Sequence, residues 1–403
     1  MGVEYLDKKN IAIIISKLNG GGAERVASNL SIELSEYYKV FLILFDGQNQ
    51  VYPYGGELIN LDIIPQRRVL KKLINLFKRI LEIRRIKKEK KISCSISLMD
   101  GPNLVNVFSK RKDKVITSVR NYMSESKKNN LRISKFIMKL IELGSDQIVS
   151  LSKTVKLDLI NNFKLNESKI IPIYNSCNIE RLLELSKENK SEIKGDTSLS
   201  VVTMGRLTYQ KGHWHLIRAF KKVLENVPNA MLYVLGEGEL LNNLREQSKN
   251  LGIDSKVIFL GFVKNPHEFI SKCNVFVFPS LYEGLGNVLL EALACGKTCI
   301  STDCNAGPRE ILAPKTNLER KTKTIEEAEY GILVPVCDGK NRGASEPLST
   351  NELLLSEAII KVLKNRNLRE VYEKRALIRS QDFTSSKITE SWLNVINSLI
   401  GSK

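Results

Sequence analysis

The chain has 403 residues, of which 42% are hydrophobic and 26% charged, a composition that excludes gross disorder. This length suits two domains of roughly 200 residues each. No apolar run approaches the ~18 residues that span a bilayer, and the seven cysteines are scattered without a CxxC pair. We therefore expect a cytoplasmic protein without a disulfide framework or a zinc site.

The formal net charge of +18 implies an anionic partner, which could be nucleic acid, an anionic membrane or a phosphorylated substrate. The excess is concentrated, because residues 67–91 contain twelve Lys or Arg and only two Glu, a local net charge of +10. This concentration indicates a basic patch.

Short apolar runs alternate with amphipathic stretches along most of the chain. The predicted strands are Ile11–Ser16, Val40–Phe45, Ile92–Leu98, Val115–Val119, Gln147–Leu151, Leu199–Met204, Met231–Leu235, Lys256–Phe259, Val275–Phe278, Thr298–Ser301 and Gly331–Val334. Helices are predicted between them, for example at Ala23–Tyr37, Gly212–Glu225, Glu239–Leu251 and Gly286–Cys295. Apolar strands separated by helices are typical of parallel sheets that are covered on both faces.

A polar, glycine-containing stretch at residues 184–197 predicts a linker between two domains. We expect a first domain at 1–178 and a second at 179–384, with a final helix at about 385–403 that packs back on the first. The predicted fold class is α/β, with two doubly wound Rossmann-like domains facing a cleft.

The first predicted strand leads into three consecutive glycines, Gly20, Gly21 and Gly22, followed by Glu24 and Arg25 at the start of a helix. Glycines let backbone amides approach a ligand, and a helix N-terminus favours negative charge, so this loop could bind an anion. The alternative is an ordinary tight turn between a strand and a helix.

The basic segment 67–91 carries apolar residues at every third or fourth position, which predicts a helix with one apolar face. These apolar residues are Leu70, Leu73, Ile74, Phe77, Ile80 and Leu81. Such a basic amphipathic helix is typical of segments that lie at the surface of an anionic membrane. The alternative is a helix that packs on the core and exposes its basic face to solvent.

The second predicted domain opens with a strand and a loop in which Arg206 and Lys211 precede the helix near Gly212. Two cations at the carboxyl end of a parallel strand suit a diphosphate. The alternative is a pair of solvated basic residues.

A later loop and helix carry two acids, Glu283 and Glu291, and the apolar neighbours of Glu291 imply that its helix is largely buried. A buried carboxylate needs partners, which ribose hydroxyls or helix-terminal amides could provide.

Several of these motifs occur in the order found in a known family. They are Gly205-Arg206-Leu207, Gln210-Lys211-Gly212, Gly236-Glu237-Gly238, Gly261-Phe262 and the pair Glu283 and Glu291. The chain resembles the retaining glycosyltransferases with the GT-B fold, often called family 4 or group 1. The match is specific over about residues 199–336 and weaker at residues 20–26. Residues 303–312 resemble members that build capsular, lipopolysaccharide or lipid-linked glycans.

The resemblance implies a nucleotide-sugar donor, with its diphosphate held by Arg206 and Lys211, its ribose by Glu291 and its sugar facing Glu283. The resemblance also implies donor binding by the motif residues Gly205, Gly236 and Glu237 and by the loop residues Gly284, Leu285, Gly286, Asn287 and Val288. Many relatives carry a first-domain histidine near the sugar. At that place this chain has Arg120 and Asn121, which we take as candidates for the acceptor or sugar side.

The chain contains no Asp-x-Asp triplet, and two cations with two helix N-termini could stabilise a leaving diphosphate, so we expect no metal cofactor. The expected donor is a UDP-hexose or UDP-N-acetylhexosamine, with GDP-mannose as the alternative. The expected acceptor is a glycan or a polyprenyl-diphosphate-linked sugar, reached from the inner face of the cell membrane. Three other classes of protein remain as alternatives. The first is a nucleic-acid-binding protein, although the sequence has no helix-turn-helix, zinc or RRM motif. The second is another enzyme of this fold, such as an inverting transferase or a sugar epimerase, and the third is a sugar-nucleotide sensor without activity.

Overall fold

The computed structural model describes residues 8–64, 66, 68–188 and 199–401, with Val69 described by its backbone alone. Part of the predicted linker and residue Arg67 therefore lie outside the described residues. The chain divides into two compact units, Met1–Ser176 with Ser385–Lys403 (unit 1) and Cys177–Thr384 (unit 2). Each unit contains one seven-stranded, mainly parallel sheet with helices, so the predicted α/β class is confirmed.

The sheet of unit 1 has the order β3-β2-β1-β4-β5-β6-β7, and every neighbouring pair is parallel. The strands are β1 (Asn10–Ile15), β2 (Lys39–Leu44), β3 (Glu57–Asn60), β4 (Cys94–Leu98), β5 (Lys114–Val119), β6 (Gln147–Ser150) and β7 (Ile170–Pro172). The strand order reverses direction between β1 and β4, which is the point where doubly wound sheets bind ligands at their carboxyl ends.

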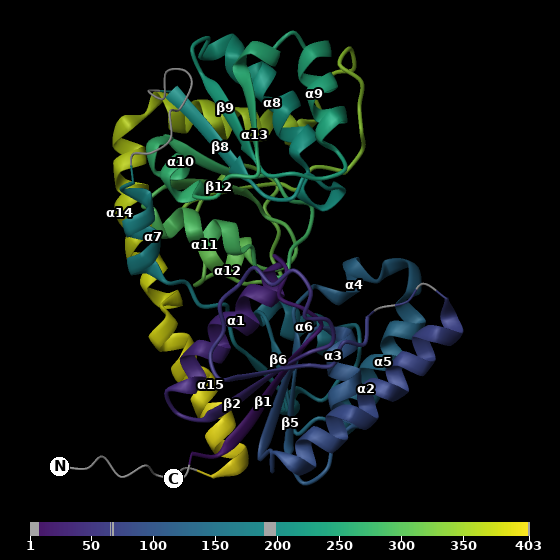
Figure 1. Ribbon diagram of the computed structural model, residues 1–403. Coiled ribbons are helices and arrows are strands. Elements are labelled where there is room, and N and C mark those ends of the chain that lie inside the picture. The colour runs from purple at the N-terminus through teal and green to yellow at the C-terminus, as the bar shows by residue number, and fades with distance from the viewer. Residues whose placement is uncertain (1–7, 65, 67, 189–198, 402–403) are drawn as a thin grey trace, which may run out of the picture. The chain divides into compact units, whose positions relative to one another are not determined.

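The helices of unit 1 come from both ends of the chain (Figure 1). They are α1 (Gly22–Ser35), α2 (Val69–Glu89), α3 (Asp100–Phe108), α4 (Met123–Ser126), α5 (Leu131–Gly144), α6 (Lys153–Asn161) and α15 (Ser385–Ile400). Helix α15 packs against α1. Its Trp392 is buried in the same hydrophobic cluster as Ile11 and Leu34, so the last helix completes the core of this unit.

The sheet of unit 2 has the order β10-β9-β8-β11-β12-β14-β13, and its direction reverses between β8 and β11. The strands are β8 (Ser200–Met204), β9 (Met231–Leu235), β10 (Val257–Gly261), β11 (Val275–Phe278), β12 (Thr298–Thr302), β13 (Glu326–Glu327) and β14 (Ile332–Val334). The helices are α7 (Ile179–Ser186), α8 (His213–Asn226), α9 (Leu241–Asn250), α10 (Pro266–Lys272), α11 (Asn287–Ala294), α12 (Pro308–Leu312), α13 (Thr350–Lys364) and α14 (Arg366–Ser380). Only the edge strand β13 runs antiparallel, against β14.

Each predicted strand corresponds to one in the structure, with its ends shifted by at most two residues. Three strands were not predicted: β3, β7 and β13. All three are short edge or near-edge strands, and β3 and β13 are only half-buried or exposed. They lack the continuous apolar run that marks a strand covered on both faces.

The basic segment forms helix α2, and the sheet covers an apolar stripe of this helix that the sequence did not single out. The residues of α2 that pack against the core of unit 1 are Leu76, Ile80, Ile83 and Ile86. The other five predicted apolar residues remain exposed, and they are Leu70, Leu73, Ile74, Phe77 and Leu81. The helix thus has two apolar stripes, of which the sheet covers one. In the part of the chain that the structure describes, no helix is long and apolar enough to cross a bilayer.

Candidate functional site

The loops that carry the second-domain motifs meet at the carboxyl ends of β8, β9 and β10. The amide of Gly205 donates to Leu235 O, that of Gly236 to Gly261 O and that of Leu207 to Glu237 O, at 2.8–3.0 Å. Gly236 has φ +126°, and a Cβ at this position would lie 2.0 Å from Gly205 O. A side chain there would push the first two loops apart, so the close approach requires glycine.

Lys211 and Glu283 form an ion pair at the switch point between β8 and β11. Lys211 Nζ lies 2.6 Å from Glu283 Oε1, and the two side chains are 14% and 7% exposed. Glu283 also accepts hydrogen bonds from Ser280 Oγ at 2.6 Å and from Gln210 Nε2 at 3.3 Å. The carboxylate is therefore fixed by three neighbours. Lys211, which we expected to hold the donor diphosphate, and Glu283, which we expected to face the donor sugar, contact each other directly.

The approach of these two residues depends on Gly212, which follows Lys211 and precedes α8. Gly212 has φ +62°, and a Cβ would lie 2.4 Å from Pro279 O in the loop after β11. The amide of Leu281 donates to Gln210 O at 2.8 Å, which ties the same two loops together. The left-handed glycine thus brings the loop after β8 against the loop after β11.

The charge of Arg206 is not balanced within the described part of the chain. Its side chain is exposed and makes no hydrogen bond or ion pair with another described residue. His213, at the first turn of α8, adds no charge, because burial and the nearby Lys211 lower the pKa of its imidazole to about 3. The cations available for an anion at the end of β8 are therefore Arg206 and Lys211.

The loop after β11 ends in a helix N-terminus. Gly286 is the N-cap of α11 and adopts a left-handed conformation, and the amides of Leu289 and Leu290 both donate to Gly286 O. Gly284 and Leu285 precede it, and Asn287 and Val288 form the first turn of α11. A helix start attracts negative charge, because its first amides lack intrahelical acceptors and its dipole is positive there.

Glu291, one turn into α11, has a partner that the sequence did not suggest. His267 on α10 is 3% exposed, and its Nε2 lies 3.1 Å from Glu291 Oε2. The other ring nitrogen, Nδ1, is buried and has no hydrogen-bond partner among the described residues. Glu291 itself is 7% exposed, so the imidazole restricts the orientation of a nearly buried carboxylate. Nothing in the sequence links a lone histidine at 267 to an acid 24 residues later.

Glu237 and Phe262 lie together at the edge of these loops. Glu237 Oε1 accepts a hydrogen bond from the Phe262 amide at 3.4 Å, and the Phe262 ring is 77% exposed. An exposed aromatic ring beside a polar loop offers a flat surface on which a nucleobase could stack.

In unit 1, the glycine loop closes on its own helix. The carboxylate of Glu24 accepts a hydrogen bond from the amide of Gly21 at 2.8 Å, and Glu24 is 8% exposed. Gly20 and Gly22 flank this contact, and Arg25 lies exposed on the first turn of α1. One amide of the loop is therefore already bound by a carboxylate of the protein, as in a helix cap.

Arg120 follows β5 and is buried, whereas the adjacent Asn121 is exposed. The guanidinium of Arg120 donates to Ser118 Oγ and to Asn175 Oδ1, and its Nε has no partner among the described residues. Burial lowers the pKa of Arg120 to about 9, so the group stays charged at neutral pH without a carboxylate against it. An uncompensated buried cation is costly unless an anion binds it.

A doubly wound unit with two cations, a helix N-terminus and buried acids at its switch point is typical of nucleotide-binding α/β proteins. Comparison with known proteins makes the assignment more specific. Residues 186–332 match the family described as glycosyl transferases group 1.

Two relatives and one solved structure illustrate the similarity. An uncharacterized glycosyltransferase of Methanocaldococcus jannaschii is 38% identical over 301 residues, which cover 71% of this chain and 72% of that protein. The N-acetylgalactosamine-N,N'-diacetylbacillosaminyl-diphospho-undecaprenol 4-alpha-N-acetylgalactosaminyltransferase of Campylobacter jejuni is 28% identical over 96% of this chain and 99% of its own length. Anabaena Alr3699/HepE, solved with UDP and glucose, is similar in fold, with a TM-score of 0.75, 17% identity and coverage of 97% and 100%.

The chain belongs to the glycosyl transferases group 1 family. It is a glycosyltransferase, and its two doubly wound units are those of the GT-B fold.

Proposed function

We propose that this enzyme transfers a hexose or N-acetylhexosamine from a UDP-sugar to a glycan or polyprenyl-diphosphate-linked acceptor, with retention of the anomeric configuration, in the synthesis of a cell-surface polysaccharide. The observation that carries the proposal is the ion pair of Lys211 and Glu283 at the switch point of unit 2, with Arg206 in the same loop as Lys211 and Glu291 on the helix that follows Glu283.

Arg206 and Lys211 hold the diphosphate in this proposal, together with the amides at the start of α11. As the bond from the anomeric carbon to the diphosphate breaks, negative charge grows on the leaving phosphate, and fixed cations and amides stabilise it. Lys211 Nζ donates a hydrogen bond to Glu283 Oε1. Donor binding therefore requires the ammonium group to turn from the carboxylate toward the phosphate or to contact both.

Glu291 binds the ribose hydroxyls in this proposal, with His267 behind it as a positioning residue. Glu283 faces the sugar. The same cations make a divalent metal dispensable. The geometry at Glu283 is held by Ser280 and Gln210 as well as by Lys211, so the acid keeps its position when Lys211 moves.

The choice of a UDP-sugar rests on relatives and neighbours, namely the UDP-bound Anabaena protein and the N-acetylgalactosaminyltransferase of Campylobacter jejuni. A thermal-shift screen of UDP, GDP and their sugar nucleotides tests it, because a ligand that binds the folded state raises its stability by mass action. A larger shift with GDP-mannose than with any UDP-sugar would contradict the donor assignment. NMR of the product anomer tests retention.

Arg120 is the proposed contact for the acceptor diphosphate in unit 1, with Asn121 beside it. The buried guanidinium has no carboxylate partner among the described residues, and the relative from Campylobacter jejuni is named for a diphospho-undecaprenol glycan substrate. Arg120→Gln should raise the KM for a polyprenyl-diphosphate acceptor and leave UDP binding unchanged. An equal loss of UDP affinity would contradict the assignment.

Docking on an anionic membrane at the inner face of the cell membrane is the last part of the proposal. Several cations of α2 and its flanks make no ion pair with a described residue: Arg68, Lys71, Lys72, Lys78, Lys88 and Lys91. Other basic residues of the segment are engaged, since Lys87 is buried against Asp113 and Arg79 lies over the ring of Phe45. The free cations lie near the exposed apolar stripe of α2, a combination that suits a lipid surface.

Helix α5 carries a second exposed apolar stripe, which the sequence did not single out. It exposes three large apolar side chains, and they are Ile133, Phe136 and Leu143. Arg132 and Lys135 are exposed on the same helix. Helix α3 packs against both α2 and α5, so the two exposed stripes belong to one helical layer of unit 1.

Cosedimentation with liposomes of anionic lipid tests the docking proposal. Each cation near an anionic surface contributes about 1 kcal/mol, so Lys71, Lys72 and Lys78 changed together to Gln should weaken binding roughly 100-fold at low salt. The control is the triple change of Lys221, Lys364 and Lys374 to Gln, because these lysines of unit 2 are equally exposed and unpaired. Equal binding by the two triple variants, or no binding of the wild type, would contradict docking through α2.

A further inference from the structure

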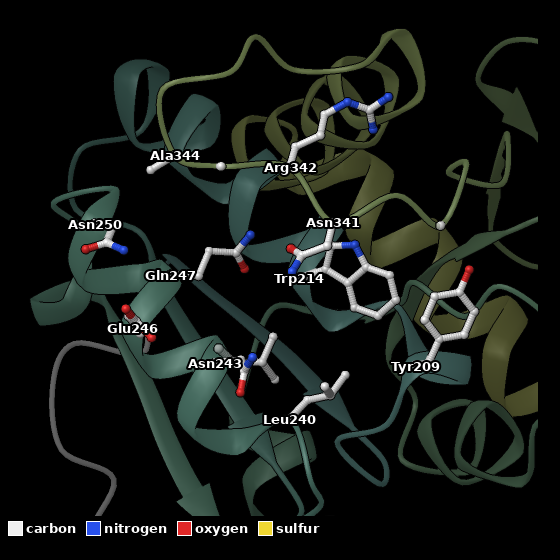
Figure 2. A pocket seen from close by; sticks show the side chains of 13 residues that line it. Tyr209, Trp214, Leu240, Asn243, Glu246, Gln247, Asn250, Asn341, Arg342 and Ala344 are labelled. Carbon is white, nitrogen blue, oxygen red and sulfur yellow. The ribbon is translucent and has the colours of Figure 1, made fainter.

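Unit 2 contains a pocket that the proposed donor site does not use. Its walls come from the start of α8, from α9 and from residues 339–344 (Figure 2). Its volume is about 320 Å³, which is at the lower end of the range of small-molecule pockets.

The wall formed by residues 339–344 is held by a buried charge. Arg218 is completely buried and donates hydrogen bonds to the carbonyls of Arg342, Gly343, Glu346 and Pro347. Its charge is balanced by Glu352, whose Oε1 lies 3.0 Å from Arg218 Nε. The ring nitrogen of Trp214 donates to Lys340 O at 3.1 Å. The pocket therefore has a fixed wall, because this loop is anchored to α8 at several points, and Glu352 on α13 fixes Arg218 in turn.

Gln247 on α9 lines the pocket with an unsatisfied amide. Both Nε2 and Oε1 are buried, and neither has a hydrogen-bond partner among the described residues. Figure 2 shows this amide directed toward the side of the pocket where Asn341 and Trp214 lie. Buried polar atoms are nearly always paired, so a donor and an acceptor without partners in a cavity indicate a polar ligand.

The remaining lining indicates the class of that ligand. Asn243, Asn250 and Asn341 bring three more amides, and Tyr209 and Trp214 bring aromatic rings. Amides present both a donor and an acceptor, as sugar hydroxyls do, and aromatic rings pack against the apolar face of a sugar. An anion is disfavoured, because Arg342, the one cation among the lining residues, is already paired on both terminal nitrogens with Asp338.

We propose that this pocket binds a neutral sugar ring, either free or as a unit of a glycan chain. The proposal is independent of the donor site, but the two sites share an element. Tyr209 is the first residue of the short helix η4 (Tyr209–Lys211), which ends at Lys211. A sugar that contacts Tyr209 therefore lies against the segment that carries a donor-binding cation, so its binding should alter the affinity for UDP.

Tryptophan fluorescence can report binding directly, because the chain has two tryptophans and the second, Trp392, lies in the core of unit 1. In a Trp392→Phe background, Trp214 is the only reporter. We would titrate glucose, galactose and their N-acetylhexosamine counterparts in the presence of saturating UDP, which occupies the nucleotide part of the donor site. We expect a saturable change with a Kd on the order of 1 mM for at least one sugar.

Gln247→Leu should weaken binding at least tenfold while the Tm stays equal or rises, because the change removes an unsatisfied buried amide. A merely structural glutamine would instead lower the Tm. Asn243→Ala, an exposed position, provides a second variant with the same expected loss. Gln381→Leu, an exposed glutamine elsewhere in unit 2, should bind as wild type.

A trisaccharide of the same unit that binds more tightly would identify a glycan chain as the ligand, and equal affinity would identify a single ring. The proposal is overturned if no sugar changes the fluorescence, or if Gln247→Leu and Asn243→Ala bind like the wild type.

Discussion

The contact between Lys211 and Glu283 has a consequence that can be measured in two ways. Changing Lys211 to Met leaves the Glu283 carboxylate, which is 7% exposed, with hydrogen bonds from Ser280 and Gln210 but no cation. Breaking a fully buried ion pair costs about 3–5 kcal/mol. Because Lys211 is 14% exposed and two hydrogen bonds remain, we expect a loss of about 1–3 kcal/mol in the free energy of unfolding.

The double-mutant cycle isolates the pair. Glu283→Gln removes the charge and keeps the shape, so the double variant no longer contains an uncompensated carboxylate. We expect a coupling energy of about 1–2 kcal/mol from denaturant unfolding of the two single variants and the double variant. The control is the cycle of Lys222→Met and Glu225→Gln, a pair on α8 with the same 2.6 Å separation but 43% and 54% exposure. Its coupling should not exceed about 0.5 kcal/mol.

The same variants separate the roles of the two residues in binding. Lys211→Met should weaken UDP binding by about 1.5–3 kcal/mol, or roughly 10- to 150-fold, because it removes a charge-assisted contact with the diphosphate. Glu283→Gln should bind UDP at least as tightly as wild type, since the carboxylate that competes for Lys211 is gone, while turnover falls. Isothermal titration with UDP and a transfer assay measure both. An additive stability cycle, or equal losses of UDP affinity in the two variants, would refute this reasoning.

Three further predictions concern the same unit. Glu291→Gln should lower the affinity for UDP more than it lowers turnover at saturating donor. His267→Phe should lower the affinity less, because the imidazole only orients the carboxylate. If both variants bind UDP as tightly as the wild type in titrations, the ribose is bound elsewhere. The pKa of His213 is about 3 in the folded state and near 6.5 in the unfolded state. Below about pH 6.5 the unfolded state therefore binds a proton that the folded state does not. The free energy of unfolding should fall as the pH drops from 6.5 toward 3. Between pH 6 and pH 4, His213→Gln should reduce the pH dependence of the free energy of unfolding by about 1 kcal/mol per pH unit. An unchanged slope would show that His213 is not the group responsible. EDTA should leave transfer activity largely intact, and a complete loss that magnesium restores would contradict the metal-independent proposal.

The sequence by itself determined the α/β class and the positions of the buried strands along the chain. Strands such as Ile11–Ile15 are continuous apolar runs, because a strand covered by helices on both faces needs an apolar side chain at every position. The motif residues around Arg206 and Glu283 were also accessible from sequence, since such residues follow directly after buried strands, and the carboxyl ends of parallel strands meet at one edge.

The tertiary structure decided which residues contact one another across those loops. The pairing of Lys211 with Glu283 joins residues 72 positions apart, and it depends on the left-handed Gly212 packing against Pro279. The role of His267 was likewise invisible, because a hydrogen bond between two helices leaves no periodic pattern in either sequence.

Helix α2 is a second feature that the sequence alone could not decide. Periodicity predicted a helix with an apolar face, but two apolar stripes share this helix, and only packing decides which one is buried. The sheet of unit 1 covers Ile83 and Ile86 and leaves Phe77 and Leu81 exposed. A sequence records which side chains are apolar, whereas the surface that covers them is assembled from strands distant along the chain, and for that physical reason only the folded structure could assign the faces.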